Sequence, residues 1–132
     1  MLILYGCMRK TSRNIDSHRD LKVWQRSIEL TLNTYRLSSV FPRSEQFGLT
    51  SQLRRASVSI AANIAEGNGR HTDRDYAHFL SMAIGSAREV DTLLVITGEL
   101  GYGNREDHHR CLDLLGEINR MLESIHARLS GQ

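Results

Sequence analysis

Residues 49–69 read LTSQLRRASVSIAANIAEGNG, and this stretch decides the fold class. Its apolar residues recur every three or four positions, which is the spacing of one face of an α-helix. The residues on this apolar arc are Leu49, Leu53, Ala56, Ile60 and Ile64, and those on the opposite side are Val58, Ala61 and Ala65. The pattern predicts a helix that begins between Ser44 and Leu49 and ends at Glu66, with a left-handed cap at Gly67-Asn68-Gly69.

The same period continues on both sides of this stretch and predicts further helices. One runs from about Leu21 to Ser38 and is ended by Phe41-Pro42, because proline disfavours a helical conformation in the residue before it. Another starts at Thr72, where Asp75 three positions later completes a pair like a capping box. This helix stops at Gly101-Tyr102-Gly103. The connections between these helices are short.

A last helix follows the capping residue Asn104 and runs from about Arg105 to Leu129. Its apolar residues recur alternately three and four positions apart, which is the spacing of a helix that packs in a bundle. They are Leu115, Ile118, Leu122, Ile125 and Leu129. Short connections make consecutive helices antiparallel neighbours. We therefore predict an all-α protein: a single-domain, antiparallel up-down four-helix bundle over residues 20–130, preceded by a poorly ordered extension at residues 1–19.

Two features indicate that these helices pack closely and self-associate. Gly85 and Gly98 lie inside the third helix, where each costs up to about 1 kcal/mol relative to alanine, so they indicate close backbone approach. The first three helices also carry two apolar sides, which is more than one bundle core uses. A contiguous apolar patch left on the surface marks an interface. We expect a cyclic homo-oligomer.

The composition is that of an ordinary globular protein. The 132 residues are 40% hydrophobic and 24% charged. No apolar run approaches the ~20 residues of a membrane helix. Cys7 and Cys111 lie far apart and form no disulfide or metal-binding motif, which is typical of reduced thiols. We expect a cytoplasmic protein without a membrane partner.

The charge is unevenly distributed along the chain. Residues 1–70 contain 11 Lys/Arg and 5 Asp/Glu, whereas residues 71–132 contain 6 and 10, so the balances are +6 and −4. One interpretation is that the basic half packs against the acidic half. The other is that the basic half binds an anionic partner such as nucleic acid. The candidate nucleic-acid-binding residues are Arg43, Arg54, Arg55 and Arg70.

A narrow polar stripe on the helix of residues 49–66 is unlike a solvated face. It is rich in amide and hydroxyl groups and is flanked by alanines; its members are Gln52, Arg55, Ser59, Asn63 and Glu66. On the third helix, Glu89 is a single acid among apolar residues. A buried carboxylate needs a cationic partner. We therefore predict a structural polar network in which Glu89 pairs with Arg55 or Arg54, within or between subunits.

The sequence offers no catalytic, cofactor-binding or metal-binding constellation. Glu106 with His109, and Glu123 with His126, have the Glu-x-x-His spacing of di-iron bundles. However, leucine and isoleucine already fill the seam of that helix, and the second pair points away from it. Nucleophile motifs and phosphate-cradling loops are also missing. We expect a protein that is not an enzyme and takes no cofactor or metal.

Several runs of sequence resemble one protein family. They are Leu21-Lys-Val-Trp-Gln25, Phe41-Pro42, Phe47 to Ala56, Ser59 to Arg70, Phe79-Leu80 and Gly85 to Glu89. Over about residues 20–128 the chain resembles the four-helix-bundle proteins encoded within bacterial 23S rRNA intervening sequences. The resemblance implies a barrel-shaped homopentamer without catalytic residues. It also implies the fold of the accessory variability protein of diversity-generating retroelements, which works with a reverse transcriptase and RNA.

These observations lead to two alternative functions. In the first, a non-enzymatic oligomer binds RNA weakly through backbone contacts of its basic surface, because the chain has few aromatic residues for base stacking. In a cyclic oligomer each exposed arginine is repeated in every subunit, which concentrates the charge. In the second, the same surface is a protein-interaction scaffold without a nucleic-acid role. A nucleic-acid-processing protein is a further partner compatible with the first.

Overall fold

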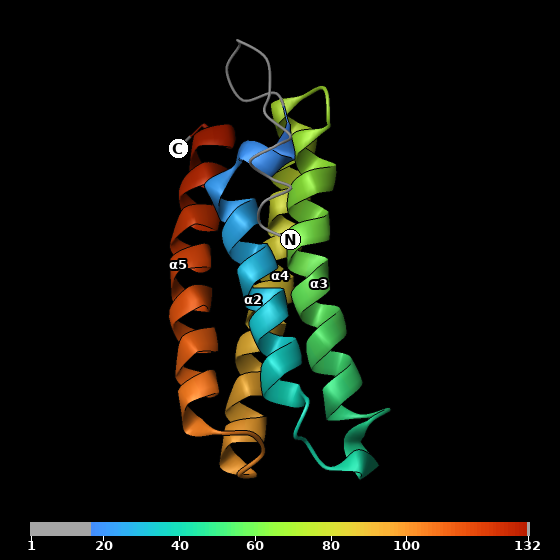
Figure 1. The fold of residues 1–132 in the computed structure, drawn as a ribbon. Coiled ribbons are helices and arrows are strands. Elements are labelled where there is room, and N and C mark those ends of the chain that lie inside the picture. The colour runs from blue at the N-terminus through green and yellow to red at the C-terminus, as the bar shows by residue number, and fades with distance from the viewer. Residues whose placement is uncertain (1–16, 132) are drawn as a thin grey trace.

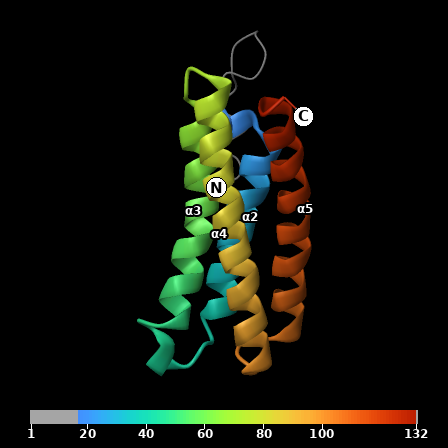
Figure 2. The same ribbon diagram turned by 180° about the vertical axis from the view of Figure 1, so that it is seen from behind.

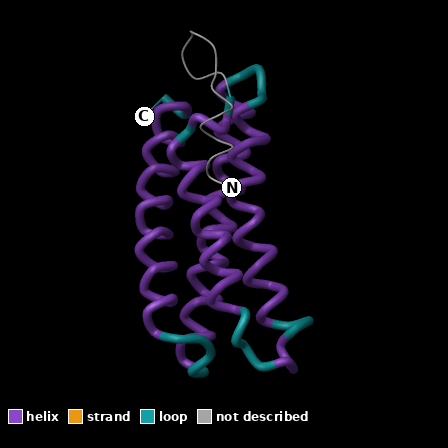
Figure 3. Tube along the Cα trace, in the orientation of Figure 1, coloured by secondary structure: helices purple, strands orange, loops and turns teal. Residues whose placement is uncertain are grey.

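The structure, a computed structural model, describes residues 17–131, and within this range it contains helices and no strands (Figures 1 and 3). The long helices are α2 (Lys22–Ser38), α3 (Leu49–Asn68), α4 (Asp73–Glu99) and α5 (Arg105–Leu129). Two short 3-10 helices, η1 (His18–Asp20) and η2 (Arg43–Glu45), precede α2 and α3. The prediction for residues 1–19 falls mostly outside the described residues; within them, Ser17 accepts a hydrogen bond from the Arg19 N–H and caps η1.

The helices form an antiparallel ring in which each one packs on its neighbours in the chain. α3 packs on α2 and α4, α5 packs on α4, and α2 packs on α5 to close the ring (Figures 1 and 2). The α3–α4 interface is the most extensive. This arrangement confirms the predicted all-α four-helix bundle.

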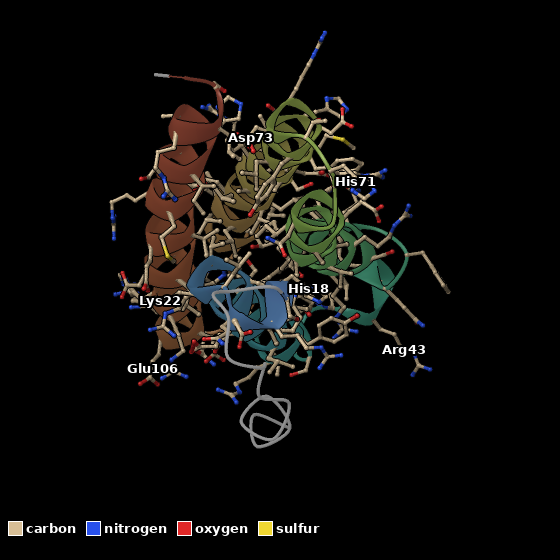
Figure 4. The ribbon with its side chains drawn as sticks, turned by 90° about the horizontal axis from the view of Figure 1, so that it is seen from above. His18, Lys22, Arg43, His71, Asp73 and Glu106 are labelled. Atoms are coloured by element: carbon tan, nitrogen blue, oxygen red, sulfur yellow. The ribbon has the colours of Figure 1, made fainter. Side chains whose placement is uncertain are left out.

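The core lies between the helices and is built from the predicted apolar seams (Figure 4). Fully buried side chains come from all of them and include Leu30, Leu37, Leu53, Ile60, Ile64, Leu80, Leu94, Leu115, Ile118 and Leu122. Ile125 and Leu129, at the end of the α5 seam, are only partly buried and pack against the edge of the core. Burial of these stripes supplies most of the stability of the bundle, because helix propensity alone is marginal in water.

Side-chain caps define where the helices begin. Thr72 Oγ1 accepts a 3.1 Å hydrogen bond from the Asp75 N–H and starts α4 as predicted. Asn104 Oδ1 accepts a 2.7 Å hydrogen bond from the Asp107 N–H at the start of α5. α3 begins at Leu49, whose N–H donates to Glu45 Oε1 over 3.1 Å. Each cap satisfies a backbone donor that the first helical turn leaves without a partner.

The glycines play other roles than those predicted. α3 extends to Asn68 and ends at Gly69 with φ −85°, so the left-handed cap predicted there is wrong. The close approach predicted at Gly85 is also wrong within the chain, since no atom lies within 4 Å of an added Cβ; at Gly98 the contact is an ordinary one. Close approach occurs instead at Gly67, where a Cβ would lie 2.8 Å from Phe79 Cβ.

Candidate functional site

The predicted polar stripe borders a cleft between α3 and α4. The cleft has a volume of about 380 Å³ and is lined by Gln52, Arg55, Ala56, Ser59 and Glu89. Gln52, Arg55 and Ser59 lie three to four positions apart, so they project from one side of α3 over about two turns. Three residues of the predicted stripe and Glu89 of α4 thus line one cleft.

Hydrogen bonds join the middle of this stripe to α4. Ser59 Oγ and Ser86 Oγ are 2.8 Å apart, which links α3 to α4. Asn63 Nδ2 donates to Ser59 O over 2.9 Å and to Ser59 Oγ over 3.1 Å. Ser86 is a member of the network that sequence reasoning missed; its signal is its position three residues before Glu89 on the same face of α4.

The predicted ion pair of Glu89 is not formed within the described chain. Arg55 and Glu89 line the same cleft, but both are exposed and neither makes a hydrogen bond or ion pair in residues 17–131. Water reaches both charges, so neither requires a partner for solvation. Pairing of Glu89 between subunits stays a prediction.

Arg54 points away from the cleft toward α2. Its Nε donates a 2.8 Å hydrogen bond to Ser38 Oγ, and its guanidinium carbon lies 4.4 Å from the centre of the Tyr35 ring. Successive residues on a helix are rotated by about 100°, so Arg54 and Arg55 face different neighbours. Arg54 therefore stabilises the α2–α3 interface, and its guanidinium is less available to an external phosphate.

Arg70 is also held by the protein itself. Its Nη2 lies 2.8 Å from Glu66 Oε2, and its guanidinium carbon lies 4.5 Å from the centre of the Phe79 ring. Glu66 thus pairs with Arg70 and takes no part in the network around Ser59. Arg43, on η2, is exposed and has no such contact in residues 17–131. Of the predicted nucleic-acid-binding residues, Arg43 and Arg55 are the ones whose guanidinium groups remain free.

The structure adds a cationic groove that the sequence did not predict. It lies between α2 and α5, has a volume of about 450 Å³, and is lined by Leu21, Lys22, Val23, Glu117, Arg120, Met121, Ser124, Ile125 and Arg128. Its one carboxylate, Glu117, accepts a 3.0 Å hydrogen bond from Arg26 Nε. Lys22, Arg120 and Arg128 make no ion pair with described residues. The eight-residue spacing of the two arginines was the available signal, since it places them on one face of α5.

The comparison with known families settles the assignment of the chain. A family model described as 23S rRNA-intervening sequence protein matches residues 19–124, which include the whole of α2, α3 and α4 and most of α5.

The chain belongs to the 23S rRNA-intervening sequence protein family.

One solved crystal structure has the same fold as this 23S rRNA-intervening sequence protein. It is the crystal structure, at 1.70 Å resolution, of a protein with unknown function from the S23 ribosomal protein family of Bacteroides thetaiotaomicron VPI-5482. The two chains are 27% identical, with a TM-score of 0.72, and the match covers 79% of this chain and 97% of the other. A search of curated proteins finds no match to this chain.

The other features considered in this 23S rRNA-intervening sequence protein are metal-binding clusters, a histidine, a cysteine and membrane-spanning helices. In residues 17–131, no three His, Cys, Asp or Glu side chains gather where they could hold a metal ion. His126, from the second Glu-x-x-His pair, lies with its Nε2 3.1 Å from Ser81 Oγ. Burial raises the pKa of the Cys111 thiol to about 12, so this cysteine is protonated and a poor nucleophile at neutral pH. None of the helices in the described range could span a membrane.

Proposed function

We propose that this 23S rRNA-intervening sequence protein is a non-enzymatic, self-associating bundle of the cytoplasm that binds RNA weakly through phosphate contacts. The observation that carries the proposal concerns the four candidate arginines. Arg43 and Arg55 are exposed and make no hydrogen bond or ion pair with the described residues, whereas Arg54 and Arg70 are held by internal contacts. Arginine forms bidentate hydrogen bonds to phosphate, and a free one can do so without breaking an internal contact. The family description, which refers to an rRNA, also supports an RNA partner.

Self-association supports RNA binding because it repeats each free cation. Exposed large apolar side chains occur on several faces of the bundle, and they include Leu32, Phe47, Val58, Met82, Val95, Ile96, Leu100 and Leu112. Surfaces that carry contiguous apolar side chains are typical of interfaces. We propose a cyclic homo-oligomer, a pentamer as the family resemblance implies. A pentamer of 15.0 kDa chains has a mass of about 75 kDa, which light scattering coupled to gel filtration measures directly.

Fluorescence anisotropy with a labelled structured RNA tests the binding. We expect binding at low salt, with the logarithm of the affinity falling linearly with the logarithm of the salt concentration. Arg43→Gln combined with Arg55→Gln should weaken binding to all RNA sequences alike and reduce the salt slope by about one for each phosphate that the variant no longer binds. The charge-matched control is Arg74→Gln with Arg110→Gln, which removes the same charge from exposed positions on α4 and α5. Equal losses of affinity in the two double variants, or no binding at tens of micromolar protein, would refute the proposal.

A second candidate function is a scaffold for an acidic protein, and the α2–α5 groove favours it. The lining of the groove combines apolar side chains with Lys22, Arg120 and Arg128, which make no ion pair within residues 17–131. This arrangement suits an acidic amphipathic helix. Lys22→Ala with Arg120→Ala would weaken binding of such a partner while leaving the Arg43 and Arg55 surface intact. RNA binding that depends on the α2–α5 groove and not on Arg43 and Arg55 would identify this groove as the main anionic site.

A further inference from the structure

Phe47 is the most exposed large apolar residue of the described chain, with 90% of its surface accessible. It lies between η2 and the start of α3, in a connection that projects from the lower end of the bundle on the α3 side (Figure 1). Exposed apolar side chains are common when they are small or scattered, but an almost fully exposed phenylalanine in a projecting connection loses the hydrophobic stabilisation that burial gives. Phe47 therefore has the features of an anchor for another surface.

A groove of suitable size lies at the same end of the bundle, between α4 and α5. It has a volume of about 480 Å³, larger than the α3–α4 cleft and the α2–α5 groove, and its lining includes the apolar groups of Val95, Tyr102 and Leu112. Val95 is 55% exposed and Leu112 is 40% exposed, so the groove is accessible to a side chain of another molecule. Leu100, also exposed, lies in the segment between two of the lining residues, Glu99 and Gly101.

The projection and the groove lie on different sides of the molecule at one level along the helices. The connection from α2 to α3 and the connection from α4 to α5 are both at the lower end in Figure 1, and α3 and α5 are opposite each other in the ring of helices. A contact between two different surfaces of the same chain is head-to-tail. Because the two surfaces are level, a rotation about an axis parallel to the bundle can join them with little shift along the helices, and a head-to-tail contact of this kind can close a ring.

Charged side chains of both signs lie beside each surface: Arg43 and Glu45 precede Phe47, and Glu99 and Arg105 line the groove. Arg43, four residues before Phe47, is exposed and unpaired within residues 17–131. Glu99 lines the groove and is also exposed and without an ion pair in that range. Docking of Phe47 in the groove of a neighbouring copy would bring these two mixed-charge rims together. Charges at the rim of an interface favour the correct orientation of the partners more than they add affinity.

We propose that Phe47 of one copy inserts into the α4–α5 groove of the next copy, and that repetition of this contact forms the ring. The inference rests on the self-association in the proposed function and assigns the two surfaces that carry it. Each copy uses Phe47 toward one neighbour and its groove toward the other.

The test uses one variant that removes the projection and one that blocks the groove. Phe47→Ser and Leu112→Glu change exposed side chains, so both chains should keep the helical circular dichroism of the wild type. Loss of one buried phenylalanine weakens each interface by about 10- to 150-fold. We expect each variant alone to have a mass near 15.0 kDa in sedimentation experiments at micromolar concentration. Val40→Ser, which changes an exposed apolar side chain outside both surfaces, is the matched control and should retain the wild-type mass.

Mixing the two variants gives the diagnostic result. Phe47→Ser retains an intact groove and Leu112→Glu retains an intact Phe47, so the mixture should contain a heterodimer of about 30 kDa that forms through one wild-type interface. A mixture that stays monomeric at concentrations at which the wild type assembles would overturn the proposal. If Leu112→Glu does not fold, Val95→Glu blocks the same groove from α4.

Two other outcomes separate this inference from the function on which it rests. A monomeric wild-type chain would refute self-association itself. An oligomeric wild type whose mass is unchanged by Phe47→Ser would refute the assigned contact and leave self-association standing.

Discussion

Replacing Gly67 by alanine should destabilise the bundle, although alanine is the better helix former. Gly67 is buried near the C-terminal end of α3, where that helix meets α4. An added Cβ would lie 2.8 Å from Phe79 Cβ, 3.0 Å from Tyr76 Cδ1 and 3.3 Å from the Tyr76 carbonyl oxygen. Carbon atoms in favourable contact are about 3.5–4.0 Å apart. Because Phe79 Cβ is attached directly to the α4 backbone, no rotation of that side chain relieves the contact, and the helices must separate.

The size of the effect follows from two opposing contributions. Forcing an extra methyl group into a well-packed core costs about 1–3 kcal/mol. The gain in helix propensity from glycine to alanine is about 1 kcal/mol in a helix interior and less in the last turn, where Gly67 lies. The net expectation for Gly67→Ala is a decrease of about 1–2 kcal/mol in the free energy of unfolding. For a domain of this size, that lowers Tm by about 4 °C per kcal/mol.

Gly85→Ala is the matched control, since it makes the same substitution inside α4. No atom outside the local backbone lies within 4 Å of the added Cβ, so the propensity gain of about 0.5–1 kcal/mol should appear without a packing penalty. Urea denaturation followed by circular dichroism, at one protein concentration for all chains, measures both. Equal stability of Gly67→Ala and Gly85→Ala would refute the close α3–α4 contact.

Three further predictions concern a cap, a thiol and a titration. Thr72→Ala removes the hydrogen-bond acceptor of the Asp75 N–H and should lower the free energy of unfolding by about 1 kcal/mol, measured by urea denaturation. In a Cys7→Ser background, Cys111 should react with a thiol reagent at pH 8 only as fast as the chain unfolds, because burial raises its pKa to about 12; rapid reaction of the folded protein would contradict this. Burial lowers the pKa of His18 below its ordinary value of 6.5, with Arg19 adding to the effect. The folded chain therefore binds this proton less readily than the unfolded chain, and stability should fall as the pH drops below 6.5. A wild-type decline no steeper than that of His18→Gln in thermal melts would contradict the assignment.

The helices were predictable because their apolar periodicity is long and continuous. Leu53, Ile60 and Ile64 of α3 are all completely buried, as the spacing indicated. The end of the same helix was less predictable. Gly67 carries the sequence signature of a turn, but the packing against Phe79 requires a residue without a side chain inside the helix. A local pattern cannot distinguish these two reasons for a glycine.

The candidate site was predictable in its position but not in its contacts. The spacing of Gln52, Arg55 and Ser59 placed them on one side of α3, and the structure brings them together with Glu89 around one cleft. Which guanidinium group meets which neighbour depends on helix rotation, and for this reason Arg54 faces Ser38 rather than Glu89. The spacing of Arg120 and Arg128 places both on one face of α5, but the α2–α5 groove itself was not predictable, because Lys22 comes from the other end of the bundle and meets them only when the ring of helices closes.

The order of the helices around the ring has a consequence for how the chain folds. The α2–α3, α3–α4 and α4–α5 contacts each join successive helices, and the α2–α5 contact alone joins the two ends of the bundle. Contacts that are local along the chain form quickly, whereas closing a long loop carries an entropic cost. During synthesis the first three helices can pair before the 25 residues of α5 are available. Until α5 docks, the apolar sides of α2 and α4 that it covers stay open to water, and exposed apolar surface of this kind favours aggregation.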